Sequence, residues 1–161
     1  MQRIFLLTAI FFFSAFILRA QEAAERESSE SGESTYEIIV SGIYAYNLEE
    51  EKGLPGAELH FTYWFNRHWG AGATYIAKFE EEEVLSDIAL LGSWNPSRLF
   101  TINAGPNFGF KAEKRDFEVS LYVEGELNIR PAEWFLFGPN LGFLAGNSSE
   151  IATGIHVGFE F

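Results

Sequence analysis

From residue 36 to residue 161, apolar side chains recur at every second position in eight successive stretches. The clearest, FEVSLYVEGELNI at 117–129, places Phe, Val, Leu and Ile on one face and Glu, Ser, Tyr and Asn on the other. A period of two predicts β-strands. Each stretch has about 10–13 residues, longer than the 5–6 typical of soluble strands and suited to crossing a bilayer at a tilt. The eight ranges are 36–46, 56–65, 69–79, 84–94, 100–110, 117–129, 134–145 and 151–161.

The connections between these stretches alternate in character. Tight turns are predicted at 66–68, 95–98 and 130–133, and polar, mostly charged loops at 47–55, 80–83, 111–116 and 146–150. Short connections favour antiparallel hairpins. The sequence therefore predicts an all-β fold, an eight-stranded antiparallel up-and-down transmembrane β-barrel over residues 36–161.

A short motif occurs twice within these strands, as GPNFGF at 105–110 and GPNLGF at 138–143. Each copy follows a tight turn and an aromatic residue, as repeated hairpins would. Pro106 and Pro139 remove a backbone donor from the strand, so we expect both to lie at β-bulges.

The volume of the apolar face indicates which face points outward. An eight-stranded barrel encloses only enough space to be filled by side chains. The apolar face is dense in Phe, Tyr, Leu, Ile and Trp, whereas the opposite face is largely Gly, Asn, Thr, Ser, Glu and Ala. We therefore expect the apolar face to contact lipid, with Ile39, Ile43 and Leu91 as exceptions on the lumen face. A soluble, lipocalin-like barrel with an apolar interior is the alternative.

Aromatic residues gather near both ends of the predicted strands, as in the two interfacial belts of a membrane barrel. One belt lies beside the tight turns and the C-terminus, and the other lies beside the acidic loops. The first contains Phe65, Trp69, Trp94, Phe100, Phe135 and Phe161, and the second Tyr44, Tyr46, Phe79, Phe110, Phe117 and Phe143.

Two segments precede the barrel. Residues 1–20 contain Arg3 and a short apolar run at 4–18, which predicts a signal peptide, with an uncleaved membrane anchor as the alternative. Residues 21–35 are acidic and serine-rich with no large apolar side chain, which predicts a disordered periplasmic leader.

Charge and cysteine content exclude several classes of function. The net charge of −12 disfavours nucleic acid as a partner. The absence of cysteine excludes disulfides, thiolate nucleophiles and Cys-based zinc sites. The sequence predicts no cofactor and no metal site, although the runs 49–51 and 80–83 could hold Ca²⁺ or Mg²⁺; a solvated acidic rim is the favoured interpretation.

With these features together, residues 36–161 resemble the small eight-stranded outer-membrane β-barrel proteins of Gram-negative-type bacteria. The resemblance implies a location in the cell outer membrane, with both ends of the barrel periplasmic. It also implies a C-terminal signal for the barrel-assembly machinery, here Ile155, Val157, Phe159 and Phe161. We expect outer-membrane lipid and that machinery as partners, and a monomer.

Eight ionisable residues on the expected lumen face lie within the membrane band. We expect a water-containing polar network there, with a narrow ion path as the alternative, and we expect Glu58 to pair with Lys78. The predicted network contains Glu58, His60, Lys78, Glu118, Glu124, Glu126, His156 and Glu160.

The sequence contains no convincing catalytic set. A lipid-modifying enzyme would need a serine, a histidine and an acid in register at the outer surface, and no serine is placed beside His60, His68 or His156. We therefore predict a non-enzymatic protein with a role in envelope integrity, adhesion or interaction. The alternatives are a narrow ion-conducting pore and an outer-membrane lipid-modifying enzyme.

Overall fold

The computed structural model describes residues 35–161 except 82, 111, 113–115 and 148. The predicted signal peptide, and the predicted leader apart from Thr35, lie outside the described residues. Within the part of the chain that is described, no helix is long and apolar enough to cross a membrane.

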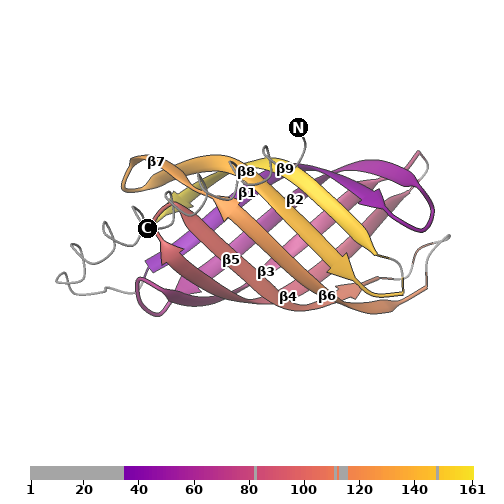
Figure 1. Ribbon diagram of the computed structural model, residues 1–161, viewed down its shortest axis with the longest axis horizontal. Helices are drawn as coiled ribbons and strands as arrows, with labels where there is room; N and C mark the ends of the chain where they lie inside the picture. Colours follow the sequence, from indigo (N-terminus) through magenta and orange to yellow (C-terminus); the bar gives the residue numbers. More distant parts are fainter. Residues whose placement is uncertain (1–34, 82, 111, 113–115, 148) are drawn as a thin grey trace, which may run out of the picture. The chain divides into compact units, whose positions relative to one another are not determined.

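The described chain forms one antiparallel sheet that closes on itself as a barrel (Figure 1). Consecutive strands pair along the chain, and β1 closes the ring against β9 over Glu37–Asn47 and Glu150–Glu160. The strands are β1 (Thr35–Asn47), β2 (Lys52–Trp64), β3 (Trp69–Phe79), β4 (Val84–Ser97), β5 (Phe100–Gly109), β6 (Glu118–Leu127), β7 (Ile129–Ala132), β8 (Phe135–Ala145) and β9 (Glu150–Glu160).

β6 and β7 are two parts of one long barrel strand. Only Asn128 separates them, and both pair with β8. The predicted eight-stranded up-and-down barrel is therefore confirmed.

Burial follows the predicted alternation. Large apolar side chains on one face of every long strand are exposed on the outside of the barrel, including Leu59, Phe61, Leu90, Leu121 and Ile155. The opposite face is buried, and Ile39, Ile43 and Leu91 lie on it as expected.

Strand ends differ from the prediction at three connections. β2 already begins at Lys52, β4 continues to Ser97, and β7 occupies most of the predicted 130–133 turn, so that the turn itself lies at 133–134. In each case the backbone stays paired with the neighbouring strand through polar or proline-containing sequence. Pairing is made by backbone groups, so a polar side chain does not end a strand. Two register shifts lie beside the turns at 98–99 and 133–134, one between Trp94 and Ser97 and one between Ile129 and Ala132.

The prediction that the two strand prolines lie at bulges is wrong. β4 and β5 keep one register on both sides of Pro106, since Ala89 faces Asn107 and Gly92 faces Ala104. Pro139 likewise faces Ile155 within an unbroken β8–β9 ladder.

The glycine before each proline explains how the ladder tolerates it. A Cβ atom at Gly105 would lie 1.8 Å from the carbonyl oxygen of Leu90, and one at Gly138 would lie 1.7 Å from that of Leu127. Proline has no N–H to donate to the carbonyl of the neighbouring strand. That carbonyl therefore lies against the Cα atom of the glycine instead. The repeated Gly-Pro sequence thus encodes the same local geometry twice.

Candidate functional site

The lumen of the barrel contains the charged groups from which a function could be built. The turn end of the barrel lies at residues 65–68, 98–99 and 133–134. The described residues of the loop end are 48–51, 80–81, 83, 110, 112, 116–117, 146–147 and 149. Between the two ends the buried side chains form successive layers.

The layer at the turn end is an ion-pair cluster around Arg130. Its guanidinium contacts Glu160 and lies 3.3 Å from the carboxylate of Glu37, a side chain only 2% exposed. Thr35 also donates to Glu160 at 3.2 Å. This cluster joins β7 to β1 and β9 where the ring closes.

The layer at the middle of the lumen is the central cluster, defined as Glu58, His60, Glu124 and Glu126. All four side chains are buried. Asn140 donates to Glu124 at 2.7 Å, and Thr74 donates to Glu58 at 2.6 Å. Neutral side chains from several strands therefore orient the carboxylates.

A hydrogen bond also crosses the lumen at this level: Tyr122 on β6 donates to Glu58 on β2 at 3.3 Å. Along the wall, Asn103 on β5 donates to Glu126 on the adjacent strand β6 at 3.0 Å. These contacts hold the three carboxylates and the imidazole of the central cluster in the buried interior.

The second buried histidine lies toward the turn end. His156 shares a hydrogen bond of 2.9 Å with Asn128, which donates to Thr101 at 2.8 Å. Asn128, the residue between β6 and β7, thus links β9 to β5.

An apolar layer separates the central cluster from the loop end. Its members are six buried residues contributed by five strands. They are Ile43, Ile76, Ala89, Leu91, Tyr122 and Leu144.

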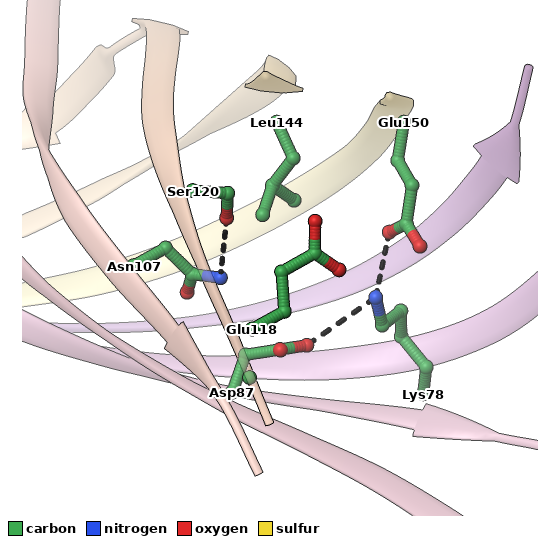
Figure 2. Close-up of a pocket in the computed structure, with 8 residues that line it drawn as sticks. Lys78, Asp87, Asn107, Glu118, Ser120, Leu144 and Glu150 are labelled. Atoms are coloured by element: carbon green, nitrogen blue, oxygen red, sulfur yellow. Dashed lines mark hydrogen bonds and ion pairs between the residues drawn. The ribbon is translucent and has the colours of Figure 1, made fainter. Parts of the chain in front are cut away.

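The layer at the loop end surrounds a small polar cavity of about 20 Å³, room for about one water molecule (Figure 2). The Lys78 ammonium lies 2.6 Å from Glu150 and 3.3 Å from Asp87. Asn107 donates to Ser120 at 3.1 Å. The expected Glu58–Lys78 pair is therefore wrong: Lys78 points to the loop end, while Glu58 bonds with Thr74 and Tyr122.

The eight residues predicted for the lumen network fall into separate groups. Glu58, His60, Glu124 and Glu126 come together, whereas Lys78 lies in the loop-end layer and Glu160 in the turn-end layer. Glu118 lines the loop-end cavity and accepts the backbone N–H of Asn147 at 2.6 Å, and His156 bonds with Asn128.

Sequence reasoning missed several lumen groups. Glu37, Asp87 and Glu150 have the alternation parity of their buried neighbours, so the pattern could have identified them. Arg130 lies in the predicted 130–133 turn; it has the parity of Glu126 and Asn128, but the sequence does not indicate that the strand continues through Pro131.

The predicted assembly-signal residues lie on the outer face of the last strand. Ile155, Val157, Phe159 and Phe161 are all exposed. Phe161 exchanges two backbone hydrogen bonds with Tyr36, of 2.8 and 2.9 Å. Its role in assembly remains a prediction.

Hydrogen bonding in the described residues does not assemble a serine triad. His60 bonds with Thr62, His156 with Asn128 and His68 with the carbonyl of Asn95. The nearest approach to general acid–base chemistry is therefore the central cluster, which lies inside the barrel.

Comparison with solved structures identifies the fold. The N-terminal β-barrel domain of Pseudomonas aeruginosa OprF matches with a TM-score of 0.60 at 15% identity, covering 81% of this chain and 100% of that one. The chain has the fold of the small outer-membrane β-barrels.

Two further matches have the same small-barrel fold. Yersinia pestis Ail, solved in complex with the heparin analogue sucrose octasulfate, has a TM-score of 0.53 at 17% identity, covering 82% of this chain and 100% of that one. P. aeruginosa OprG has a TM-score of 0.52 at 13% identity, covering 82% and 97%. No protein-family model matches the sequence, and no curated protein matches it either.

Proposed function

We propose that this chain is a bacterial outer-membrane protein whose barrel is closed to ion flow and whose role is structural or interactive within the envelope. The observation that carries this proposal is the apolar layer across the lumen. Ions crossing the barrel would have to lose their hydration among Ile43, Leu91 and Leu144, which is costly. The sealed cross-section favours a structural role over the narrow pore.

The outer surface supports a membrane location. Exposed aromatic side chains lie at both barrel ends, as at the two interfaces of a bilayer. Trp69 and Trp94 stack at the turn end with ring centroids 6.1 Å apart, and Tyr44 and Phe117 are exposed toward the loop end. We propose that the turn end faces the periplasm and the acidic loops face outward, in a monomer embedded in outer-membrane lipid and inserted by the barrel-assembly machinery.

Planar-bilayer recording with the full chain tests the sealed lumen. We expect no conductance steps from the natural sequence, and steps from a Leu91→Gly/Tyr122→Gly variant that empties the apolar layer. Heat-modifiable gel mobility of both proteins verifies that the barrels are folded. Steps from the natural sequence that disappear with Glu124→Gln or Glu126→Gln would establish the narrow pore instead.

Two other measurements test location and catalysis. We expect the protein in the detergent-extracted outer-membrane fraction and unchanged acylation of outer-membrane lipid when the chain is expressed. Recovery in the aqueous fraction would contradict the membrane location, and altered acylation would establish a lipid-modifying enzyme.

The acidic loops indicate the charge of an interaction partner. The runs 49–51 and 80–83 consist of glutamate, so these two loops repel polyanions. We propose a cationic partner, or lipid headgroups bridged by divalent cations, rather than a sulfated sugar. Detergent-solubilised protein should fail to bind sucrose octasulfate at physiological ionic strength; micromolar binding would contradict this part of the proposal.

A further inference from the structure

The central cluster brings together metal-ligating side chains from opposite walls of the barrel. One ligand atom each from Glu58, His60 and Glu124 lies within 4.8 Å of the other two. Glu58 and His60 belong to β2 and Glu124 to β6, the second and sixth strands of the eight-stranded ring. The three groups therefore meet across the lumen rather than along one strand.

Two buried atoms of this cluster have no hydrogen-bond partner. They are Nδ1 of His60, a residue 2% exposed, and Oε2 of Glu126, which is also 2% exposed. Nδ1 lies 3.6 Å from Oε1 of Glu126, too far for an ordinary hydrogen bond. An unpaired buried polar atom is costly, so these two atoms indicate a missing partner.

The orientation of His60 suits metal ligation. Its Nε2 lies 2.9 Å from the hydroxyl oxygen of Thr62. If Nε2–H donates to Thr62, the lone pair of Nδ1 is free to bind a cation, and the hydrogen bond fixes the ring. Metal-ligating histidines are commonly held in this way by their second nitrogen.

The cluster also has an excess of negative charge. In the described part of the chain, neither lumen cation forms an ion pair with Glu58, Glu124 or Glu126. Lys78 pairs with Asp87 and Glu150, and Arg130 with Glu37 and Glu160. Buried carboxylates are compensated by a cation or by protonation, and a bound metal ion would supply the cation that this cluster lacks.

We propose that the lumen binds one divalent transition-metal cation of the Zn²⁺ class through Glu58, His60 and Glu124, with Glu126 as an additional oxygen ligand. Imidazole together with carboxylate suits Zn²⁺ and its neighbours, whereas Ca²⁺ and Mg²⁺ prefer oxygen ligands alone. Tetrahedral ligation with bonds of about 2.1 Å separates ligand atoms by about 3.4 Å, so side-chain rotation alone closes the site. The ion would connect β2 to β6 across the lumen, a binding property beyond the proposed envelope role.

The test uses the full chain without a polyhistidine tag, folded in detergent in metal-free buffer. After incubation with ZnCl₂ and gel filtration, elemental analysis should show about one equivalent of zinc per chain. The same ion should raise the temperature at which the folded gel band is lost, and Co²⁺ should give visible absorption bands. Retention of Ca²⁺ but not of Zn²⁺ would overturn the assigned metal class.

Matched variants distinguish this site from adventitious binding. His60→Gln and Glu124→Gln should each lower zinc retention at least tenfold and abolish the Co²⁺ bands. His156→Gln, which removes the other buried imidazole of the lumen, should retain zinc as the natural sequence does. Gel mobility shows which variants fold. Failure of the natural sequence to retain zinc would overturn the proposal without any variant. Unchanged zinc retention in folded His60→Gln and Glu124→Gln would overturn it too. Because folding in detergent requires neither outer-membrane location nor a sealed lumen, failure here leaves the proposed function intact.

Discussion

Tyr36 and Phe161 close the barrel at its turn end through both backbone and side chains. The N–H of Tyr36 donates to the carbonyl of Phe161 at 2.8 Å, and the N–H of Phe161 donates back at 2.9 Å. Their rings stack with centroids 6.2 Å apart. The last residue of the chain therefore completes the seam between the last strand and β1, in addition to its predicted role as an assembly signal.

Two variants separate the contribution of the Phe161 backbone from that of its aromatic ring. Phe161→Ala keeps both backbone hydrogen bonds, whereas deletion of Phe161 removes them along with the ring. We expect both changes to reduce insertion in cells, measured as the folded fraction in outer membranes. The deletion should also lower the urea stability of barrels folded in lipid vesicles by about 1–2 kcal/mol more than Phe161→Ala does, because it removes two hydrogen bonds in addition to the stacked ring. Equal insertion of all three chains would contradict the assembly signal.

Loss of Arg130 should destabilise the barrel strongly, because Glu37 would remain buried without a cation. We expect Arg130→Gln to lower the free energy of unfolding by about 3 kcal/mol, measured by urea titration. Lys52→Gln is the matched control: it breaks an ion pair with Glu80 in which the lysine side chain is 48% exposed, so solvent screening should make its loss much smaller than that of Arg130→Gln. Adding Glu37→Gln to Arg130→Gln should restore part of the loss; no restoration would contradict the buried-charge explanation.

The glycines before the two strand prolines should tolerate no side chain. Gly105→Ala or Gly138→Ala places a Cβ against a neighbouring carbonyl oxygen, and we expect each to cost at least about 3 kcal/mol or to prevent folding. Gly42→Ala, where a Cβ meets no atom within 4 Å, should change stability by less than about 0.5 kcal/mol. Gel mobility and urea titration measure both effects. Similar behaviour of Gly105→Ala and Gly42→Ala would show that the carbonyl can move aside.

The turn between β1 and β2 contains a residue in the left-handed region. Glu51 has φ of 53°, and Asn47 accepts the N–H groups of Glu49 and Glu50 to hold the turn. Glu51→Gly should stabilise the barrel by about 0.5 kcal/mol because glycine adopts this conformation without steric cost. Glu50→Gly, at an ordinary φ, should instead destabilise it by a few tenths of a kcal/mol in the same urea titration. A loss of stability in Glu51→Gly would show that the turn is not strained.

The strand count and the two faces of each strand could be predicted from residue order because both depend on local alternation. In FEVSLYVEGELNI, parity places Leu121 and Glu124 on opposite faces, and the volume of the apolar face assigns Leu121 to the outside and Glu124 to the lumen. Parity also identifies Ile39 as a lumen residue despite its apolar side chain. Strand ends such as Ala132 were less predictable, because pairing with a neighbour extends a strand through polar and proline residues.

The contacts inside the lumen were decided only by the closed barrel. Glu58 and Lys78 share a face on adjacent strands, yet Glu58 contacts Tyr122 on the opposite wall while Lys78 pairs with Glu150. Which groups meet across the lumen depends on the tilt of the strands and on the radius of the closed ring. Neither quantity is contained in any single stretch of sequence. The sequence by itself determined which side chains enter the lumen; ring closure decided that Glu58, His60 and Glu124 meet there.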